Sequence, residues 1–580
     1  MDFVAGFNTL SAPINHVTLT LLAKASYTAS DAAIIAGQPG VMMALVQLWL
    51  CTPETAVAQK ALDVLWGLLE VDHKRQTPET YDDLGSRIDG NVERGKGQGL
   101  VWRRLFGDRD IYGRLLSFCS LRTVGQANQP SKRDKTVAQA RLMDLIPKVA
   151  KLDWDTVSHS HFSDVETNYG VKDGGLVEFA ALHMVDVADD LLMHVTLIDF
   201  FAELLGIYSS DVLPLSASAG PLTPLRGSSP SLDFLIRQGL HQRTASYYLE
   251  PSKHNSIEVT YIYSRAANYL AVYATCYPIH LLESFPPIVE PLLSHVSQAL
   301  SISPNQWARG TDLQHDLHLL ASLPRVALIP CSSNATNAML KIPARPANAA
   351  ALRTLATIFH GPDHTTGDIP PYASADKDDS ASFHYEAAAA RTLYFYYLQR
   401  YPDFWSQLVN TAEIIALKDN ALAAIALMGA ITTANWAPLP TEPASNTTSG
   451  DSATGTTRHF SLPTEQQLQN PQASSIGQLA PSGILAMLAS PAVDVVLPYF
   501  MRPAQTFNNL VGGMGDVESA AYKVATAKYD LLTLFQRQLS LVSEGVEGLQ
   551  EVVAAVKRRL AEGPLGRSSE VGGRVGTMEL

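Results

Sequence analysis

Cysteine is scarce in this sequence, and the few cysteines are far apart. Only four occur among 580 residues, and no two of them form the C-x-x-C pattern of a metal or redox site. They are Cys51, Cys119, Cys276 and Cys331. Because most of them fall in apolar, helix-like runs, we expect buried thiols in a reducing compartment and no disulfide framework.

Positive charge is in the minority. Lysine and arginine number 43 against 56 aspartates and glutamates, so the formal net charge is −13. A surface for nucleic acid or for an anionic membrane needs clustered positive charge. The balance therefore argues against direct binding of either, and it is compatible with a basic protein partner.

Long hydrophobic runs are missing as well. The most apolar run, VMMALVQLWLC at residues 41–51, is about half as long as a membrane span. The N-terminal segment MDFVAGFNTLSAPINH lacks the basic start and apolar core of a signal peptide. We expect no membrane segment and a place in the cytoplasm, with the nucleus as a second compartment.

Motifs of catalysis are also absent or incomplete. No Walker loop, kinase set or H-E-x-x-H zinc motif occurs, and GKGQG at residues 95–99 has the wrong spacing for a dinucleotide turn. GDSATG at residues 450–455 lies in low-complexity sequence that cannot hold an oxyanion hole. His159 and His161 lack further metal ligands nearby. We expect no catalytic, cofactor-binding or metal-binding residues, although an all-helical enzyme with dispersed catalytic residues remains an alternative.

Helical periodicity is what the sequence has in abundance. Apolar residues recur at helical spacing in residues 55–72 and 517–542, and residues 189–205 are apolar almost all round. The first stripe is Val57, Ala61, Val64, Leu65 and Leu68, and the second is Val517, Ala521, Val524, Leu531, Phe535, Leu539 and Val542. Short segments with proline or glycine separate such runs, so these residues end helices.

The repeated order of helix, short break and helix predicts an all-α fold, a right-handed α-solenoid of HEAT- or armadillo-like repeats. A set of unrelated helical bundles is the alternative. We expect the solenoid over residues 1–436 and again over residues 476–562. Residues 437–475 are rich in proline, serine, threonine and glycine and predict a disordered insertion, and residues 563–580 predict a disordered tail.

The stretch WRRLFGDRDIYGRLLSFC, residues 102–119, places arginines and aspartates between apolar segments. A phosphate loop would need several glycines that present backbone N–H groups, and these are missing. We expect one helix to end at Gly107 and Asp108 to cap the next. Ile111, Leu115, Leu116 and Cys119 would form its buried side, and Arg103, Arg104 and Arg109 would pair with Asp108 and Asp110.

Acidic residues gather around the apolar helix expected at residues 189–205. Asp186, Asp189 and Asp190 precede it, and Thr196, Asp199 and Glu203 share one of its faces. We expect these five carboxylates to receive a basic partner surface. Two alternatives are a plain solvated helix face and pairing with an arginine of the neighbouring repeat.

Three blocks of the chain resemble a known family. They are GQGLVWRRLFGDRDIYGRLLSFCSL (97–121), LLMHVTLIDFFAELLGI (191–207) and ALKDNALAAIALMGAITTANWAPLP (416–440). They resemble the filamentous-fungal proteasome assembly chaperones, which are often catalogued as a DNA mismatch-repair protein. The animal counterpart is a non-ATPase regulatory subunit of the proteasome. The likeness covers most of the chain except the insertion and the tail.

The resemblance implies a C-shaped solenoid without enzymatic activity. It also implies binding to the C-terminal domain of one proteasomal AAA+ ATPase subunit of the regulatory-particle base, together with associated base subunits. The chaperone would guide assembly of the ATPase ring and delay its docking on the core particle. We expect a monomer. A helical scaffold or transport adaptor and a DNA-repair factor remain alternatives.

Overall fold

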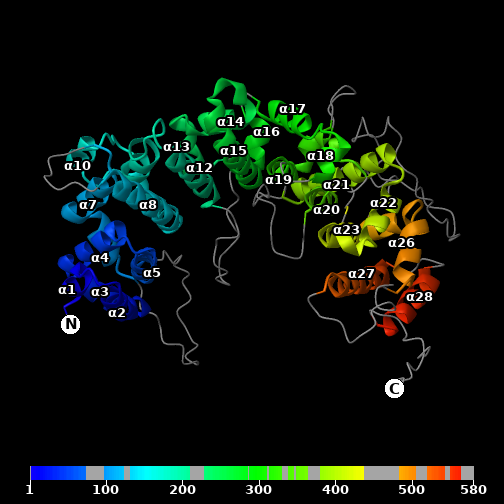
Figure 1. Cartoon of the computed structure of the whole chain (residues 1–580), viewed down its shortest axis with the longest axis horizontal. Coiled ribbons are helices and arrows are strands. Elements are labelled where there is room, and N and C mark those ends of the chain that lie inside the picture. The colour runs from blue at the N-terminus through cyan, green and yellow to red at the C-terminus, as the bar shows by residue number, and fades with distance from the viewer. Residues whose placement is uncertain are drawn as a thin grey trace, which may run out of the picture. The chain divides into compact units, whose positions relative to one another are not determined.

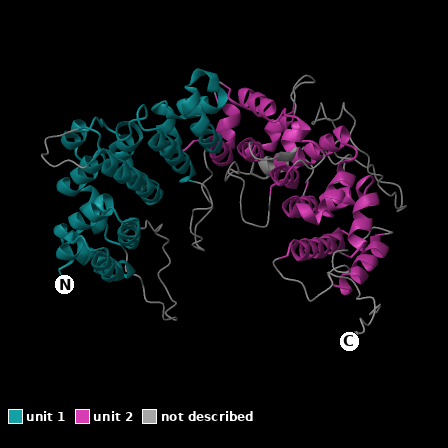
Figure 2. Cartoon of the chain, in the orientation of Figure 1, with its two compact units in different colours: residues 1–208, 230–269 teal, residues 209–229, 270–580 magenta. Residues whose placement is uncertain are grey.

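The computed structural model describes residues 2–73, 97–122, 131–208, 228–284, 287–309, 313–329, 337–344, 348–362, 379–434, 436, 482–503, 519–542 and 549–563. Every secondary-structure element in these ranges is helical (Figure 1), so the all-α prediction is confirmed. The chain divides into two compact units (Figure 2). Unit 1 comprises residues 1–208 and 230–269, and unit 2 comprises residues 209–229 and 270–580.

Unit 1 is a succession of short and medium-length helices. Its elements are α1 (Phe3–Asn8), α2 (Ala12–Leu22), η1 (Ala23–Tyr27), α3 (Ala29–Ala36), α4 (Pro39–Cys51), α5 (Thr55–Asp72), α6 (Leu100–Phe106), α7 (Arg109–Cys119), α8 (Lys132–Leu152), α9 (Trp154–Ser158), α10 (Ser163–Asn168), α11 (Gly175–Glu178), η2 (Phe179–His183), α12 (Leu191–Gly206), α13 (Pro230–Arg237), α14 (Leu240–Leu249) and η4 (Pro251–Lys253). Helix α15 (Ser256–Cys276) begins in unit 1 and ends in unit 2.

Unit 2 continues in the same style. Its elements are α16 (Pro278–Glu283), α17 (Val289–Ala299), α18 (Pro304–Arg309), α19 (Gln314–Ser322), η5 (Arg325–Leu328), η6 (Ala338–Lys341), α20 (Ala349–His360), α21 (Asp379–Arg400), α22 (Phe404–Ala412), η7 (Ile415–Leu417), α23 (Lys418–Thr433), α25 (Gly483–Met487), α26 (Ala492–Met501), α27 (Ala520–Val542) and α28 (Leu549–Ala561).

Within unit 1 the helices pack mainly on partners that are near in the sequence. Helix α4 contacts α1, α5, α7 and α8, and α8 in turn contacts α7, α9 and α12. The predicted stripe of α5 faces this core, because all five of its residues are buried. Burial of that stripe supplies the hydrophobic free energy that orders the helix.

In unit 2, α23 packs against α20, α22, α25 and α27. Among the described residues Ile415–Thr433 is long and apolar enough to cross a membrane, and the bent pair α3–α4 meets the same criterion if taken as one span. The packing of α23 on four helices accounts for its apolar composition. In α27, Val524, Leu531, Phe535 and Leu539 are buried as expected, Ala521 and Val542 are half-buried, and Val517 lies outside the described residues.

Helices that follow residues 437–481 pack on helices that precede them. Helices α25 and α27 contact α23, and α26 contacts α22. The N–H of Gly483 donates to the Ala434 carbonyl at 3.0 Å, and a Cβ on Gly483 would stand 1.7 Å from the Ile431 carbonyl oxygen. Only glycine permits this approach. The predicted insertion (437–475) and the predicted tail beyond Gly563 lie outside the described residues.

The charged stretch at residues 102–119 is a helix-to-helix turn, as expected. Helix α6 ends before Gly107, Asp108 accepts the N–H groups of Asp110 and Ile111, and the expected buried side of α7 is buried. Arg104 pairs with Asp108 at 2.7 Å. The expectation for Arg109 is wrong, because Arg109 pairs with Asp164 from α10.

The cysteine expectation holds in part. Cys119 and Cys276 are buried, whereas Cys51 is exposed at the last residue of α4, where the chain turns toward α5. Cys331 lies outside the described residues. An exposed helix end thus overrides the apolar run that suggested burial of Cys51.

A buried carboxylate joins α5 to α6. Asp72, the last residue of α5, is fully buried, and its Oδ1 accepts the N–H groups of Gln98 and Gly99 at 2.9 and 3.1 Å. Its Oδ2 accepts the N–H of Val101 at 2.6 Å. A Cβ on Gly97 would collide with the Asp72 backbone at 2.4 Å. Residues 97–99, the described end of GKGQG, are therefore fixed at the start of α6.

Replacement of Asp72 by alanine is expected to destabilise unit 1 by roughly 2–4 kcal/mol, because the N–H groups of Gln98 and Val101 lose their acceptor and that of Gly99 keeps only the Asp72 carbonyl. Hydrogen exchange should accelerate first at residues 97–106. Asp63→Ala is the matched control, because Asp63 is an exposed carboxylate on the same helix. Equal unfolding midpoints for the two variants would contradict this role of Asp72.

Candidate functional site

The five acidic residues singled out in the sequence lie at the two ends of one helix. Asp186 and Asp189 are in the turn before α12, and Asp190 caps it by accepting the N–H of Met193 at 3.0 Å. Asp199 and Glu203 stand one turn apart toward the C-terminal end of α12, which packs on α8. The carboxylates thus form two sets along the length of α12. We call the set at its N-terminal end the front acids (186, 189, 190) and the set toward its C-terminal end the rear acids (199, 203).

Two of these carboxylates have cationic partners. Lys132, at the start of α8, forms an ion pair with Asp189. Arg265, on α15, lies 3.3 Å from Asp199. Pairing with an arginine of the neighbouring repeat was one alternative weighed above, and the structure does pair Asp199 with an arginine, which lies on α15.

The remaining carboxylates are not neutralised in this way. Asp186 and Glu203 are exposed and form no ion pair with the described residues. Asp144 of α8 lies near Glu203 and pairs with Lys148 at 3.1 Å. The pKa of Glu203 is raised, first by partial burial and then by the charge of Asp144. A cation brought to this place would relieve the repulsion, so the surface favours basic ligands.

The pKa of Asp199 is raised, as that of Glu203 is. Partial burial raises the pKa of the Asp199 carboxyl, and the Arg265 guanidinium opposes that rise. The two positions sit at i and i+4 on α12, where like charges repel. The rear acids therefore hold negative charge that their own neighbours compensate only in part.

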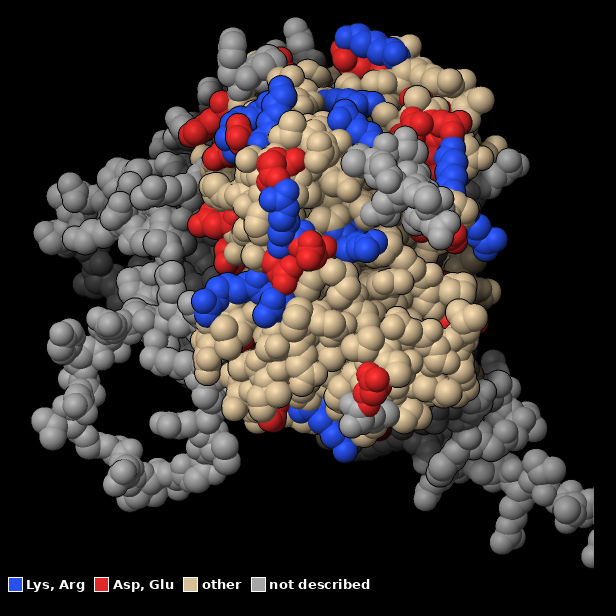
Figure 3. All heavy atoms as spheres, turned by 90° about the vertical axis from the view of Figure 1, so that its left-hand side faces the viewer, with Lys and Arg blue, Asp and Glu red and all other residues tan. Residues whose placement is uncertain are grey.

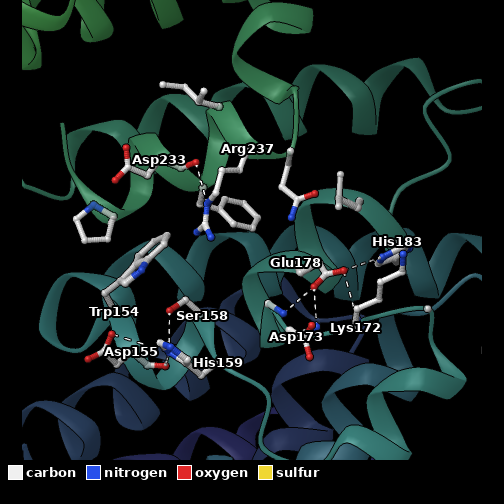
Figure 4. Close-up of a pocket in the computed structure, with 17 residues that line it drawn as sticks. Trp154, Asp155, Ser158, His159, Lys172, Asp173, Glu178, His183, Asp233 and Arg237 are labelled. Carbon is white, nitrogen blue, oxygen red and sulfur yellow. Dashed lines mark hydrogen bonds and ion pairs between the residues drawn. The ribbon is translucent and has the colours of Figure 1, made fainter.

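A groove lies elsewhere in unit 1, between α9, the loop at residues 170–174, α11 with η2, and α13 (Figure 4). Its volume is 1170 Å³. Trp154 and Phe234 form an apolar wall with ring centroids 6.3 Å apart, and Lys172, Arg237 and Asp173 stand along its rim. Sequence reasoning missed this groove, because its walls come from segments about eighty residues apart.

The floor of the groove is fixed by the buried Glu178. Its carboxylate accepts the N–H groups of Lys172, Asp173 and Gly174 at 3.3, 3.3 and 2.7 Å, and His183 Nε2 lies 3.6 Å from Oε1 (Figure 4). The chain then forms one turn of π-helix at η2, a feature often found at functional sites. The groove is therefore preformed on rigid backbone.

Ser158, His159 and Asp155 meet at the edge of this groove, but not as a catalytic triad. Ser158 Oγ lies 3.3 Å and Asp155 Oδ1 3.9 Å from the same atom, His159 Nδ1. A triad needs the serine on one ring nitrogen and the carboxylate on the other. Ser158 and Asp155 therefore lie at one and the same ring nitrogen, which is not the arrangement of a triad.

The two histidines predicted to lack a metal role contact main-chain carbonyls. His159 Nδ1 lies 3.0 Å from the Asp155 carbonyl oxygen, and His161 Nε2 lies 2.7 Å from that of Thr156. No group of three or more His, Cys, Asp or Glu within the described part of the chain is placed to hold a metal ion.

The N-terminal end of unit 1 presents a nearly uncharged face. In Figure 3 the charged side chains gather in the upper part of the view, and the lower part, over the first helices, is mostly without them. Between residues 2 and 51 only Asp2, Lys24 and Asp31 are charged. Large apolar side chains are exposed along α2 and just before it, namely Leu10, Ile14, Val17 and Leu21. Exposed apolar residues at this spacing are typical of protein-binding surfaces.

No family model matches the chain, and no curated protein is similar to it. The functional argument therefore depends on the surfaces themselves.

Replacement of Glu178 by glutamine should loosen the groove. The new amide would point a donor at backbone N–H groups. We therefore expect the free energy of unfolding to fall by about 1–3 kcal/mol. Hydrogen exchange at residues 172–174 should accelerate. Asp173→Asn, an exposed change in the same loop, is the control. Unchanged exchange in Glu178→Gln would refute the role assigned to this carboxylate.

Proposed function

We propose that this chain is a non-enzymatic chaperone that assists assembly of the proteasome regulatory-particle base. It grips the C-terminal domain of a AAA+ ATPase subunit and delays docking of that subunit on the core particle. The observation that carries the proposal is the incompletely neutralised set of carboxylates just before α12 and on it. The resemblance of the three sequence blocks supplies the identity of the partner.

The helical packing supports a protein-holding role. In each unit helices pack on neighbours that are close in the sequence, as they do in HEAT and armadillo arrays. We infer that the chain is a right-handed, C-shaped solenoid of this kind. Such arrays present long, continuous surfaces that suit a folded partner domain.

The chemistry of the surfaces suits reversible binding. Ion pairs such as Arg265 with Asp199 are about half exposed, and the groove combines an apolar wall with a charged rim. Exposed ion pairs each contribute little, and wet polar interfaces give moderate affinities. A chaperone that leaves before the mature particle works needs such an interface. We place it in the cytoplasm and nucleus, acting as a monomer.

Charge reversal should test the acidic surface. The double variant Asp186→Lys with Glu203→Lys changes two exposed carboxylates that form no ion pair with the described residues. We expect at least a tenfold loss of affinity for the ATPase C-terminal domain, about 1.4 kcal/mol, measured by titration calorimetry. Asp63→Lys on α5 is the matched control. If the double variant and the control bind alike, the acidic surface is not the interface.

Binding should also depend on pH in a defined direction. The pKa of Glu203 is raised in the free protein, by partial burial first, and a cationic partner would lower it again. Affinity is therefore full at neutral pH and is lost as the pH falls through the carboxyl pKa. Glu203→Gln should flatten this dependence in titrations at a series of pH values. If the affinity of Glu203→Gln depends on pH as that of the wild type does, the Glu203 carboxyl is not the source of the pH dependence.

Partner identity is tested separately, by purifying the chain from cells and identifying the bound proteins by mass spectrometry. Base ATPase subunits without the mature core particle are the expected result. Transport cargo or small GTPases would instead indicate a scaffold or adaptor. Tight, salt-sensitive binding of duplex DNA would indicate a direct role in repair.

A further inference from the structure

A cluster of cations lies in unit 2, where α26, α27 and α28 meet the end of α22. Lys528 of α27 stands over the ring of Tyr499, with Nζ 3.8 Å from the ring centroid. The charges of Arg502, Arg559 and Glu413 all act on this ammonium group. We call these five residues the cationic cluster. It contains three cations and one carboxylate, in a chain whose net charge is −13.

Most of the cluster is withdrawn from water. Lys528 is 9% exposed, Arg559 is 6% exposed and Tyr499 is 1% exposed. Arg502 is the exception, because half of its side chain is accessible and it pairs with Glu413 at 3.4 Å. The single carboxylate is therefore engaged at the outer edge, and the inner cations have no carboxylate of their own among the described residues.

Two polar atoms of the cluster are also buried without a hydrogen-bond partner among the described residues. They are the Tyr499 hydroxyl and Nε of Arg559. Another nitrogen of the Arg559 guanidinium donates to the Gly563 carbonyl at 2.7 Å, which holds that side chain in place. Buried donors without acceptors are costly, and a buried cation without an anion is more so.

A donor set of this kind suits one ligand class. Lysine and arginine together supply a point charge and a planar fork, the usual receptors of phosphate. Burial raises the pKa of the Tyr499 hydroxyl, which keeps it protonated as a further donor. We propose that Lys528, Arg559 and Tyr499 bind a phosphate group, either free phosphate or a phosphate monoester, with Arg502 at the entrance.

The pKa of Lys528 is consistent with a site for an anion. Burial, followed by the charges of the two arginines and partly offset by Glu413, lowers the pKa of Lys528 to about 8. A bound anion would raise it again, so binding takes up protons at and above that pH. Affinity should be full below a pH of about 8 and should fall as the pH rises through it.

Titration of the full-length chain with inorganic phosphate tests the site. At constant ionic strength we expect saturable binding by calorimetry and a rise in the melting temperature. Lys528→Met and Arg559→Gln should each weaken binding at least tenfold. Arg558→Gln is the matched control, because Arg558 is the exposed neighbour of Arg559 on α28. Tyr499→Phe removes only the hydroxyl, and it serves if Lys528→Met fails to fold.

A second series, with O-phosphoserine, distinguishes the two sources. Binding of inorganic phosphate assigns the free ion, and binding of the ester alone assigns a modified residue. Sulfate, whose charge is constant with pH, measures the pH dependence about one unit on either side of 8. The proposal is overturned if wild-type protein shows no saturable binding of either probe, if Lys528→Met or Tyr499→Phe binds as tightly as wild type, or if Arg558→Gln weakens binding as much as Arg559→Gln.

Discussion

The structure depends on buried carboxylates that accept hydrogen bonds from several backbone N–H groups at the junctions between helices. Each helix begins with donors that have no partner inside the helix, and a chain of many helices must satisfy them at every junction. Asp72 does this at the start of α6, and Glu178 does it for the loop beside the groove. In unit 2, Glu386 accepts the N–H groups of Arg325 and Val326 at 2.9 and 3.2 Å. At each place one anionic side chain fixes several main-chain groups. The backbone between the helices is thereby held in position, as the helices are.

This constraint connects the core to the candidate binding surfaces. Glu178 is only 6% exposed, yet the loop that its carboxylate holds forms part of the groove. Glu386 also pairs with the guanidinium of Arg325, whose other nitrogens donate to carbonyls of α20 at 2.9 and 2.6 Å. Stability and surface shape are therefore set by the same side chains. Exposed acidic and basic side chains are then available for binding, because they are not needed to hold the fold together.

Local patterns could be predicted from the sequence, and long-range pairings could not. The stripe of α5 and the cap at Asp108 were predictable because helix burial and capping involve residues a few positions apart. Asp72 and Val101 are separated by 29 positions, and nothing in the sequence joins them. Arg109 was assigned to its near neighbours, but Asp164 from another helix is its partner. The acidic residues around α12 were found, but their cations, Lys132 and Arg265, belong to other helices.

Those cations decide how the acidic surface works. Lys132 and Arg265 cancel part of the negative charge. The side chain of Lys132 is more than half exposed, and that of Arg265 is half exposed. The proposed basic partner would have to compete with them for Asp189 and Asp199, so its association would exchange one set of exposed ion pairs for another. Such an exchange would yield little net free energy, while the charges of Asp186 and Glu203 would still attract the partner over distance. The proposed binding would then combine fast association with modest affinity, as release of the partner requires.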